Sequence, residues 1–383
     1  VSVLILCCLV CIGYSQNLTM IEQDYEVAKA ESKKQNKMLL IDFYTTWCGP
    51  CKQIDREIFN DKAISNEIAK SFVVLRYDAE KDTAHRLSLK HHVASYPTTV
   101  ILNQDQFLLY KLYGLGGEDK DLVKNYRQFL DESALKNSKN DFVNGVSNSN
   151  NLIAPKFYED FVFRTNTKLN EAELENYWET TNNRFSEVSF AILSYFEQTP
   201  QMNSFFFANK KKYADLYGEQ DTNYLRDKIV GISFFKAIVN KNRPLFDSTV
   251  QLAKEVYEKS VVEEIITQKE EIMLISENRW AEALEKFIVR KNQGKVDEDE
   301  INRFCWATYE KSTDKNVWKK CADMMKQVTD KSAKFGYLDT YARLLYKAGN
   351  KKLSRSTMEK AIKFGKANKE DTKESENWLK SNN

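Results

Sequence analysis

The chain has 383 residues, of which 57 are Lys or Arg and 55 are Asp or Glu, so its formal net charge is only +2. This balance removes the electrostatic attraction that nucleic acids or anionic membrane surfaces require, and we expect neither as a partner. The length allows one α/β domain followed by one large or two modest further domains.

The N-terminal residues are predicted to be an export signal. Residues 1–12 are almost entirely apolar, and Gly13 and Ser15 follow in the small–x–small pattern of a cleavage site. The apolar run is too short to span a bilayer. We therefore predict a signal peptide over 1–15, truncated at its start because it lacks an initiator Met and a basic leader. The mature protein would then lie in the periplasm or outside the cell.

Removal of this signal peptide would leave four cysteines in the mature chain, namely Cys48, Cys51, Cys305 and Cys321. So few cysteines in a large exported protein do not make a disulfide-dense scaffold. Two alternatives at the N-terminus stay open. The first alternative is a membrane anchor, which would form if residues before Val1 lengthened the apolar run; we do not expect it. The second alternative is a lipid attached to Cys11, although a lipidation signal needs a small residue before the cysteine and Val10 fits this poorly.

Two cysteines lie at a predicted strand–loop–helix junction. Residues 38–44 form an apolar run broken only by Asp42, which is typical of a buried strand. Residues 51–59 show helical spacing of apolar side chains, and Pro50 falls in the first turn, where its missing N–H costs nothing. Cys48 would lie at the exposed end, where unpaired backbone N–H groups and the helix dipole stabilise a thiolate.

The sequence WCGPC at 47–51 allows a small, reversible disulfide between Cys48 and Cys51. Zinc binding would need a second pair of ligands. His91 and His92 are the only other cluster of ligand types, and we expect a surface pair at the end of a polar helix. A purely structural disulfide closing so short a loop would constrain little. The pattern therefore favours dithiol–disulfide exchange, without a metal.

The elements expected after the cysteine pair alternate between strands and helices. A turn over 103–106 should join two of the strands as a hairpin. The predicted elements are a strand over 72–78, a helix over about 82–92, a strand over 96–102, a strand over 107–113 and a helix over about 118–135.

Residues 25–135 resemble a thioredoxin domain. The matching motifs are WCGPC at 47–51, Asp42 in the preceding strand, Tyr96-Pro97-Thr98 at the start of a later strand, Gly114, and Phe129-Leu130-Asp131 in the closing helix. These motifs cover less than a third of the chain but rarely coincide by chance. The resemblance implies an α/β thioredoxin fold within 16–135 and no cofactor beyond the redox-active disulfide.

The resemblance also implies roles for the site residues. Cys48 would be the nucleophile and Cys51 the resolving thiol. Asp42 would have a raised pKa and would take the Cys51 proton as a general base, unless it is a solvated strand-end charge instead. A cis bond at Pro97 would hold the Tyr96 backbone as an edge for the substrate chain. The residues expected to contact substrate are Trp47, Gly49, Pro50, Tyr96, Pro97 and Gly114.

The second strand departs from the family pattern. Thioredoxins often place a lysine there, near the buried acid. The nearest positions here are Val73, Val74 and Leu75, with Arg76 one step beyond. Without a cation near Asp42, the pKa of this carboxyl group should be raised even further.

Beyond the first domain, residues 136–155 are polar and rich in Asn and Ser, which predicts a linker. Strand signals then vanish, and helical spacing extends over 156–383. Near the end, Ala342, Gly349 and Ser354 occupy the first-helix, turn and second-helix positions of a unit that resembles a tetratricopeptide repeat (TPR). We predict an all-α, TPR-like repeat domain, with an undifferentiated helical bundle as the alternative.

Cys305 and Cys321 lie at equal distances from Thr313, inside a predicted turn between two helices. In an antiparallel helix pair, two residues at equal distances from the turn lie at the same level along the two helices. The two cysteines could therefore form a structural disulfide, and two unlinked buried thiols are the other interpretation.

Together these features predict an exported thiol–disulfide oxidoreductase that acts on protein thiols or disulfides. It would need an upstream electron donor or acceptor, and its helical domain would bind a partner or help select substrates. The pattern resembles exported thioredoxin-fold proteins of bacteria, particularly Bacteroidetes. The alternative is a helical adaptor or chaperone-like protein whose thioredoxin domain serves as a binding module. The Cys48–Cys51 pair and Asp42 favour the enzyme, but the direction of electron flow stays open.

Overall fold

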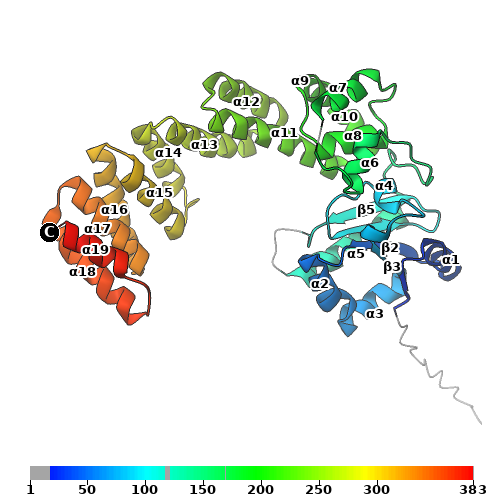
Figure 1. The fold of residues 1–383 in the computed structure, drawn as a ribbon, viewed down its shortest axis with the longest axis horizontal. Coiled ribbons are helices and arrows are strands. Elements are labelled where there is room, and N and C mark those ends of the chain that lie inside the picture. The colour runs from blue at the N-terminus through cyan, green and yellow to red at the C-terminus, as the bar shows by residue number, and fades with distance from the viewer. Residues whose placement is uncertain (1–17, 117–120, 169, 383) are drawn as a thin grey trace, which may run out of the picture. The chain divides into compact units, whose positions relative to one another are not determined.

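The computed structural model describes residues 18–116, 121–168 and 170–382 (Figure 1). The predicted signal peptide lies outside these residues. The described residues up to Arg226 form one compact unit, and those from Asp227 onward form a second.

The first unit contains a mixed five-stranded sheet with the strand order β1-β3-β2-β4-β5. The strands β1, β3 and β2 are parallel, whereas β4 and β5 are antiparallel to their neighbours. The predicted hairpin and the four predicted strands are present, and β1 is additional. The strands are β1 (Met20–Glu22), β2 (Met38–Tyr44), β3 (Phe72–Asp78), β4 (Thr98–Leu102) and β5 (Leu108–Tyr113).

Helices cover both faces of this sheet, which explains why β2 and β3 are apolar almost throughout. In Figure 1, α2, α3 and α5 lie on one side of the sheet and α4 on the other. The predicted helix over 82–92 is only the short α4. The helices are α1 (Tyr25–Gln35), α2 (Gly49–Ile54), a π-helical turn (Asp55–Phe59), α3 (Lys62–Ser71), α4 (Leu87–Lys90) and α5 (Leu122–Ser138).

The segment predicted as a linker, residues 136–155, is part of the first unit. Its Val143 N–H donates to the Leu108 carbonyl at 2.9 Å, and its Gly145 N–H donates to the Leu216 carbonyl at 2.7 Å. The first unit therefore continues past the predicted boundary at 135 and includes five further helices. These are α6 (Lys156–Val162), α7 (Glu171–Thr180), α8 (Glu187–Tyr195), α9 (Pro200–Ala208) and α10 (Lys210–Tyr217).

His91 and His92, predicted as a surface pair, are buried where these helices meet the sheet domain. His92 Nδ1 lies 2.9 Å from the Tyr158 hydroxyl, and His92 Nε2 lies 3.5 Å from a Glu187 carboxylate oxygen. Burial lowers the pKa of His92 to about 4. The surface prediction was wrong because it took no account of α6 and α8, which cover this end of the domain.

The second unit consists of helices. Neighbouring helices pack in pairs, with α16 against α17 and α17 against α18. Helix α11 (Glu219–Val239) runs across the boundary between the units. The remaining helices are α12 (Arg243–Val256), α13 (Lys259–Ser276), α14 (Trp280–Asn292), α15 (Glu298–Lys311), α16 (Lys315–Lys331), α17 (Phe335–Ala348), α18 (Lys351–Ala367) and α19 (Lys373–Ser381).

The residues of the repeat-like motif lie on α17, on α18 and between them. Gly349 ends α17 with a φ of 94°, in the left-handed region that glycine adopts without steric cost. The Ser354 hydroxyl donates to the Ala342 carbonyl at 2.7 Å, so these two small residues allow the helices to approach closely.

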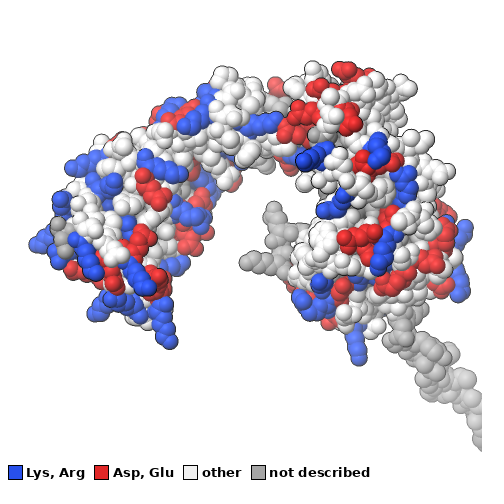
Figure 2. Space-filling view, in the orientation of Figure 1, with Lys and Arg blue, Asp and Glu red and all other residues white. Residues whose placement is uncertain are grey.

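The surface agrees with the near-neutral composition. In Figure 2, acidic and basic side chains are interspersed over the visible face of each unit. Among the described residues, no helix combines the length and the apolar character that crossing a lipid bilayer requires.

Candidate active site

Cys48 and Cys51 are joined by a disulfide at the start of α2, with their Cα atoms 5.3 Å apart. Cys48 is the N-cap residue, and its sulfur accepts a hydrogen bond from the Cys51 N–H at 3.1 Å. Pro50 lies in the first turn, as predicted. In the reduced state, a thiolate on Cys48 would lie where unpaired N–H groups and the helix dipole favour negative charge.

The exposure of the Cys48 side chain differs from what the sequence predicts. The side chain was expected at the exposed end of the motif, but Cys48 is only 3% exposed, whereas the neighbouring Trp47 is 57% exposed. The difference arises because the disulfide holds the Cys48 sulfur against the helix start, beside the buried Cys51. Little of the sulfur is therefore accessible in the disulfide form.

Asp42 is fully buried in β2, and a cation lies next to it, which the sequence alone leaves open. Arg76 of β3 pairs with Asp42 in the parallel register, and its Nε lies 2.9 Å from Asp42 Oδ2. The N–H does not point at the oxygen, so the contact is an ion pair without a hydrogen bond. The Arg76 guanidinium also donates to Asp55 in the π-helical turn.

The Arg76 side chain is enclosed by aromatic rings as well as by the two acids. Its guanidinium carbon lies 4.6 Å from the centroid of the Tyr44 ring and 5.2 Å from that of Phe59. Rings on a guanidinium replace part of its lost hydration, which allows a charged group to remain in this largely buried position.

Burial raises the pKa of Asp42 to about 7, although the charge of Arg76 opposes the shift. Desolvation prevails because neither carboxylate oxygen receives a hydrogen bond. A carboxyl group with this pKa exchanges protons near neutral pH, as a general base requires.

Tyr96, Pro97 and Gly114 form the other side of the site. The Tyr96–Pro97 peptide bond is cis, as predicted. The Gly114 N–H donates to the Pro97 carbonyl at 2.9 Å, and Gly114 has a φ of 64°, which favours glycine. The Tyr96 ring meets the Trp47 ring edge to face, with centroids 6.2 Å apart. The aromatic residue before Cys48 and the one before Pro97 therefore border a common surface.

The structure does not bring Cys305 and Cys321 into this site or into a disulfide. Both are free thiols, fully buried between α15 and α16. Cys305 Sγ lies 3.6 Å from the Cys321 carbonyl, and the Thr308 hydroxyl lies 3.4 Å from Cys321 Sγ. The two residues meet across the helix pair, as equal spacing from the turn predicts, but they remain two free buried thiols and the structural disulfide is absent.

Three residues near the site were not predicted to belong to it, although the sequence places Arg76 close to the expected position of a cation. Arg76 was detectable, because it and Asp42 occupy the same position, the fifth, in two apolar seven-residue runs that pair in register. Glu80 accepts a hydrogen bond from Trp47 Nε1 at 2.9 Å. Arg164 lies over the Trp47 ring. Nothing in the local sequence of Glu80 or Arg164 marks either residue as a neighbour of the cysteines.

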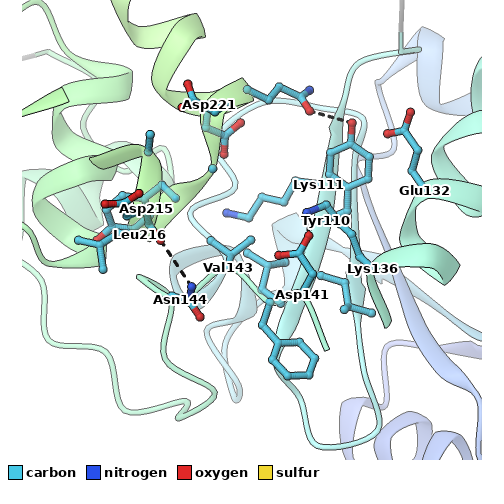
Figure 3. A pocket seen from close by; sticks show the side chains of 18 residues that line it. Tyr110, Lys111, Glu132, Lys136, Asp141, Val143, Asn144, Asp215, Leu216 and Asp221 are labelled. Atoms are coloured by element: carbon cyan, nitrogen blue, oxygen red, sulfur yellow. Dashed lines mark hydrogen bonds and ion pairs between the residues drawn. The ribbon is translucent and has the colours of Figure 1, made fainter. Parts of the chain in front are cut away.

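A separate hollow of about 230 Å³ lies between β5, residues 141–144 and residues 214–221 (Figure 3). Lys111 and Asp221 border it, and the Lys111 ammonium donates to the His91 carbonyl at 2.7 Å. Burial lowers the pKa of Lys111 to about 8. None of the predicted site residues lines this hollow. Within the described parts of the chain, no group of three or more His, Cys, Asp or Glu side chains could hold a metal ion.

Comparison with known proteins places the similarity in the first domain. The thioredoxin-like family pattern matches residues 20–104. Thioredoxin-1 of Drosophila melanogaster is 32% identical over 90 residues, which are 24% of this chain and 76% of that protein. The thiol:disulfide interchange protein DsbD of Vibrio cholerae is 33% identical over 66 residues, 17% of this chain and 11% of that protein. The solution structure of a putative disulphide-isomerase from Bacteroides thetaiotaomicron is 28% identical, with a TM-score of 0.26, over 30% of this chain and 95% of that one.

Proposed function

Because this chain belongs to the thioredoxin-like family, we propose that it is a thiol–disulfide oxidoreductase that exchanges disulfides with protein substrates through Cys48 and Cys51. The observation that carries this proposal is the Cys48–Cys51 disulfide at a helix start, in the same domain as the buried Asp42. A protein that used the domain only for binding would have no need of either feature.

In the reductive direction, the Cys48 thiolate attacks one sulfur of a substrate disulfide and releases the other sulfur as a thiolate. The Cys51 thiol then loses its proton to Asp42, directly or through water, and attacks Cys48 Sγ in the mixed disulfide. This step releases the second substrate sulfur and leaves the Cys48–Cys51 disulfide. Two electrons pass to the substrate, and an upstream dithiol donor must restore the reduced pair. With an upstream acceptor, the same steps run in reverse.

The two regions would divide the work of catalysis and recognition. The helices beyond the thioredoxin domain would bind a partner or help to select substrates, because helical repeats present extended surfaces for protein contact. The small-residue contact between Ala342 and Ser354 and the turn at Gly349 support a TPR-like unit. The apolar leader supports export to the periplasm or the cell surface, in the manner of exported bacterial thioredoxin-fold proteins.

Replacement of the resolving cysteine tests the enzymatic proposal. Cys51→Ser should accumulate mixed disulfides between Cys48 and substrate proteins, which non-reducing gels and mass spectrometry would reveal. The matched control is the double variant Cys48→Ser/Cys51→Ser, which should trap nothing. If Cys51→Ser traps no protein and the wild type reduces no protein disulfide in vitro, the domain is a binding module, and the adaptor alternative holds.

Truncation tests the role of the second unit, and the structure determines where to cut. A chain that ends at 155 would remove Tyr158 and Glu187, which contact the buried His92. A chain that ends at 242, after α11, keeps the first unit whole. If this shorter Cys51→Ser chain traps the same proteins as the full-length variant, the second unit does not select substrates.

A further inference from the structure

Arg164 belongs to the helical part of the first unit, yet it reaches the rim of the disulfide site. It follows Phe163, the C-cap residue of α6, and adopts the left-handed conformation, with a φ of 57°. Its Nη2 donates to the Ala94 carbonyl at 3.1 Å. Its guanidinium carbon lies 5.3 Å from the ring centroid of Trp47 and 5.3 Å from that of Tyr96. The guanidinium is thus held by two cation–π contacts and a backbone carbonyl.

These two rings border the surface that a substrate must cross. Trp47 precedes Cys48 in the chain, and Tyr96 precedes the cis Pro97. Cys48 itself is nearly buried and Trp47 beside it is exposed, so a substrate that reaches the Cys48 sulfur passes close to these residues. A residue that neighbours the reacting sulfur in the substrate would therefore pass within reach of Arg164.

The charge of Arg164 is available to a ligand. The side chain is exposed, and no carboxylate among the described residues forms an ion pair with it. The neighbouring acid, Glu80, accepts a hydrogen bond from the indole N–H of Trp47. A guanidinium has five N–H donors, and its planar fork matches a carboxylate in a bidentate arrangement. Because its orientation is already fixed by the rings, little side-chain freedom remains to be lost on binding.

We propose that Arg164 is a specificity-determining residue that recognises an acidic side chain beside the disulfide cysteine of a protein substrate. This inference rests on the proposed exchange activity and adds the substrate class. The helical extension thereby contributes directly to the substrate surface of the thioredoxin domain.

The test uses the full-length protein and three peptides with a reducible disulfide, identical except for Asp, Asn or Lys next to the cysteine. The wild type should show a higher kcat/KM for the Asp peptide than for the Lys peptide. Arg164→Gln should reduce this Asp-to-Lys ratio by about fivefold, the scale of one exposed charge-assisted contact. Arg164→Glu should invert the preference. Added salt should shrink the wild-type ratio, because the recognising charge is exposed.

Arg184 provides a matched control. It also lies over two rings, those of Trp178 and Phe205, and bonds to the Trp178 carbonyl, but all of these contacts lie within the helical extension. Arg184→Gln should leave the Asp-to-Lys ratio at its wild-type value. The ratio compares two substrates of one preparation, so a change in the folded fraction does not alter it.

An Asp-to-Lys ratio that is the same in the wild type and in Arg164→Glu would overturn this inference. If the peptides are reduced in a Cys48-dependent manner but without any charge preference, the inference fails while the proposed function holds. If none of the peptides is reduced and Cys51→Ser traps no protein, the proposed function itself fails.

Discussion

The described residues contain two pairs of neighbouring cysteines, one in each unit, and their surroundings differ in every respect that matters for redox chemistry. Cys48 and Cys51 lie at the start of a helix, beside an exposed tryptophan and in the same domain as a buried acid with a raised pKa. Cys305 and Cys321 lie between two helices, with no exposed surface, and burial raises the pKa of the Cys305 thiol.

The difference shows that proximity of two sulfurs is not sufficient for a redox site. Exchange requires a stabilised thiolate, a route for a second sulfur and a group that accepts a proton. The first pair has groups suited to these tasks, and the second pair fills space as apolar side chains do. Five predictions test this contrast, in order of decreasing effect.

Removal of the proposed nucleophile should have the largest effect. Cys48→Ser should lower protein-disulfide reduction to the rate of the uncatalysed reaction, because a hydroxyl group cannot replace the thiolate. Cys305→Ser, at the buried pair, should retain the wild-type rate per folded molecule. An insulin-reduction assay measures both. Substantial activity in Cys48→Ser would show that another thiol carries the exchange.

Arg76→Met should have the second largest effect. It should lower the free energy of unfolding by about 3–5 kcal/mol, because it leaves the buried Asp42 carboxylate without its cation. Urea denaturation above pH 8 measures this loss, since Asp42 is then ionised. The matched control is Arg127→Gln, whose partner Glu67 and own side chain are both nearly half exposed. It should cost less than about 1 kcal/mol. Equal losses in the two variants would contradict a special role for the buried ion pair.

Asp42→Asn should slow resolution of the mixed disulfide by about 10²-fold at pH 7, the usual contribution of a general base. The wild-type rate should rise as Asp42 ionises around its pKa of about 7, and the variant should lack this rise. Stopped-flow measurement of product release at several pH values separates the two profiles. A variant with the wild-type profile would exclude Asp42 as the proton acceptor.

The same carboxyl group should make stability depend on pH. Its folded pKa is raised above the usual 3.8, so its stabilising contribution is complete below pH 3.8 and declines as the pH rises to about 7. The slope is about 1.4 kcal/mol per pH unit near pH 5 and falls to half of this at the folded pKa, hence roughly 2 kcal/mol between pH 5 and pH 7. Urea denaturation of Asp42→Asn should show a correspondingly smaller loss over this interval.

Cys321→Ala should have the smallest effect, about 1 kcal/mol in the free energy of unfolding, as is typical of a single truncation in a core. Its activity should be unchanged, and neither Cys305 nor Cys321 should react with a thiol reagent in the native wild-type protein. Rapid labelling of either thiol under native conditions would show that the second pair is accessible after all.

Much of the first domain was predictable from local patterns. The run from Met38 to Tyr44 is β2, and the run from Phe72 to Asp78 is β3, with the predicted ends. The α/β fold followed by helices is confirmed by the structure and by the family match over 20–104. The cysteine motif and the cis bond before Pro97 were also recognisable, because each depends on residue types at fixed spacing.

The amino-acid sequence alone thus determined the chemistry at Cys48, through the motif, the helix start and the apolar strand behind it. Tertiary structure decided what surrounds that chemistry. Arg76 became the partner of Asp42 through strand register, His92 became buried through α6 and α8, and Arg164 reached Trp47 from a distant segment. Local patterns report on neighbours within a few residues, whereas burial and charge pairing depend on which segments meet after the chain has folded.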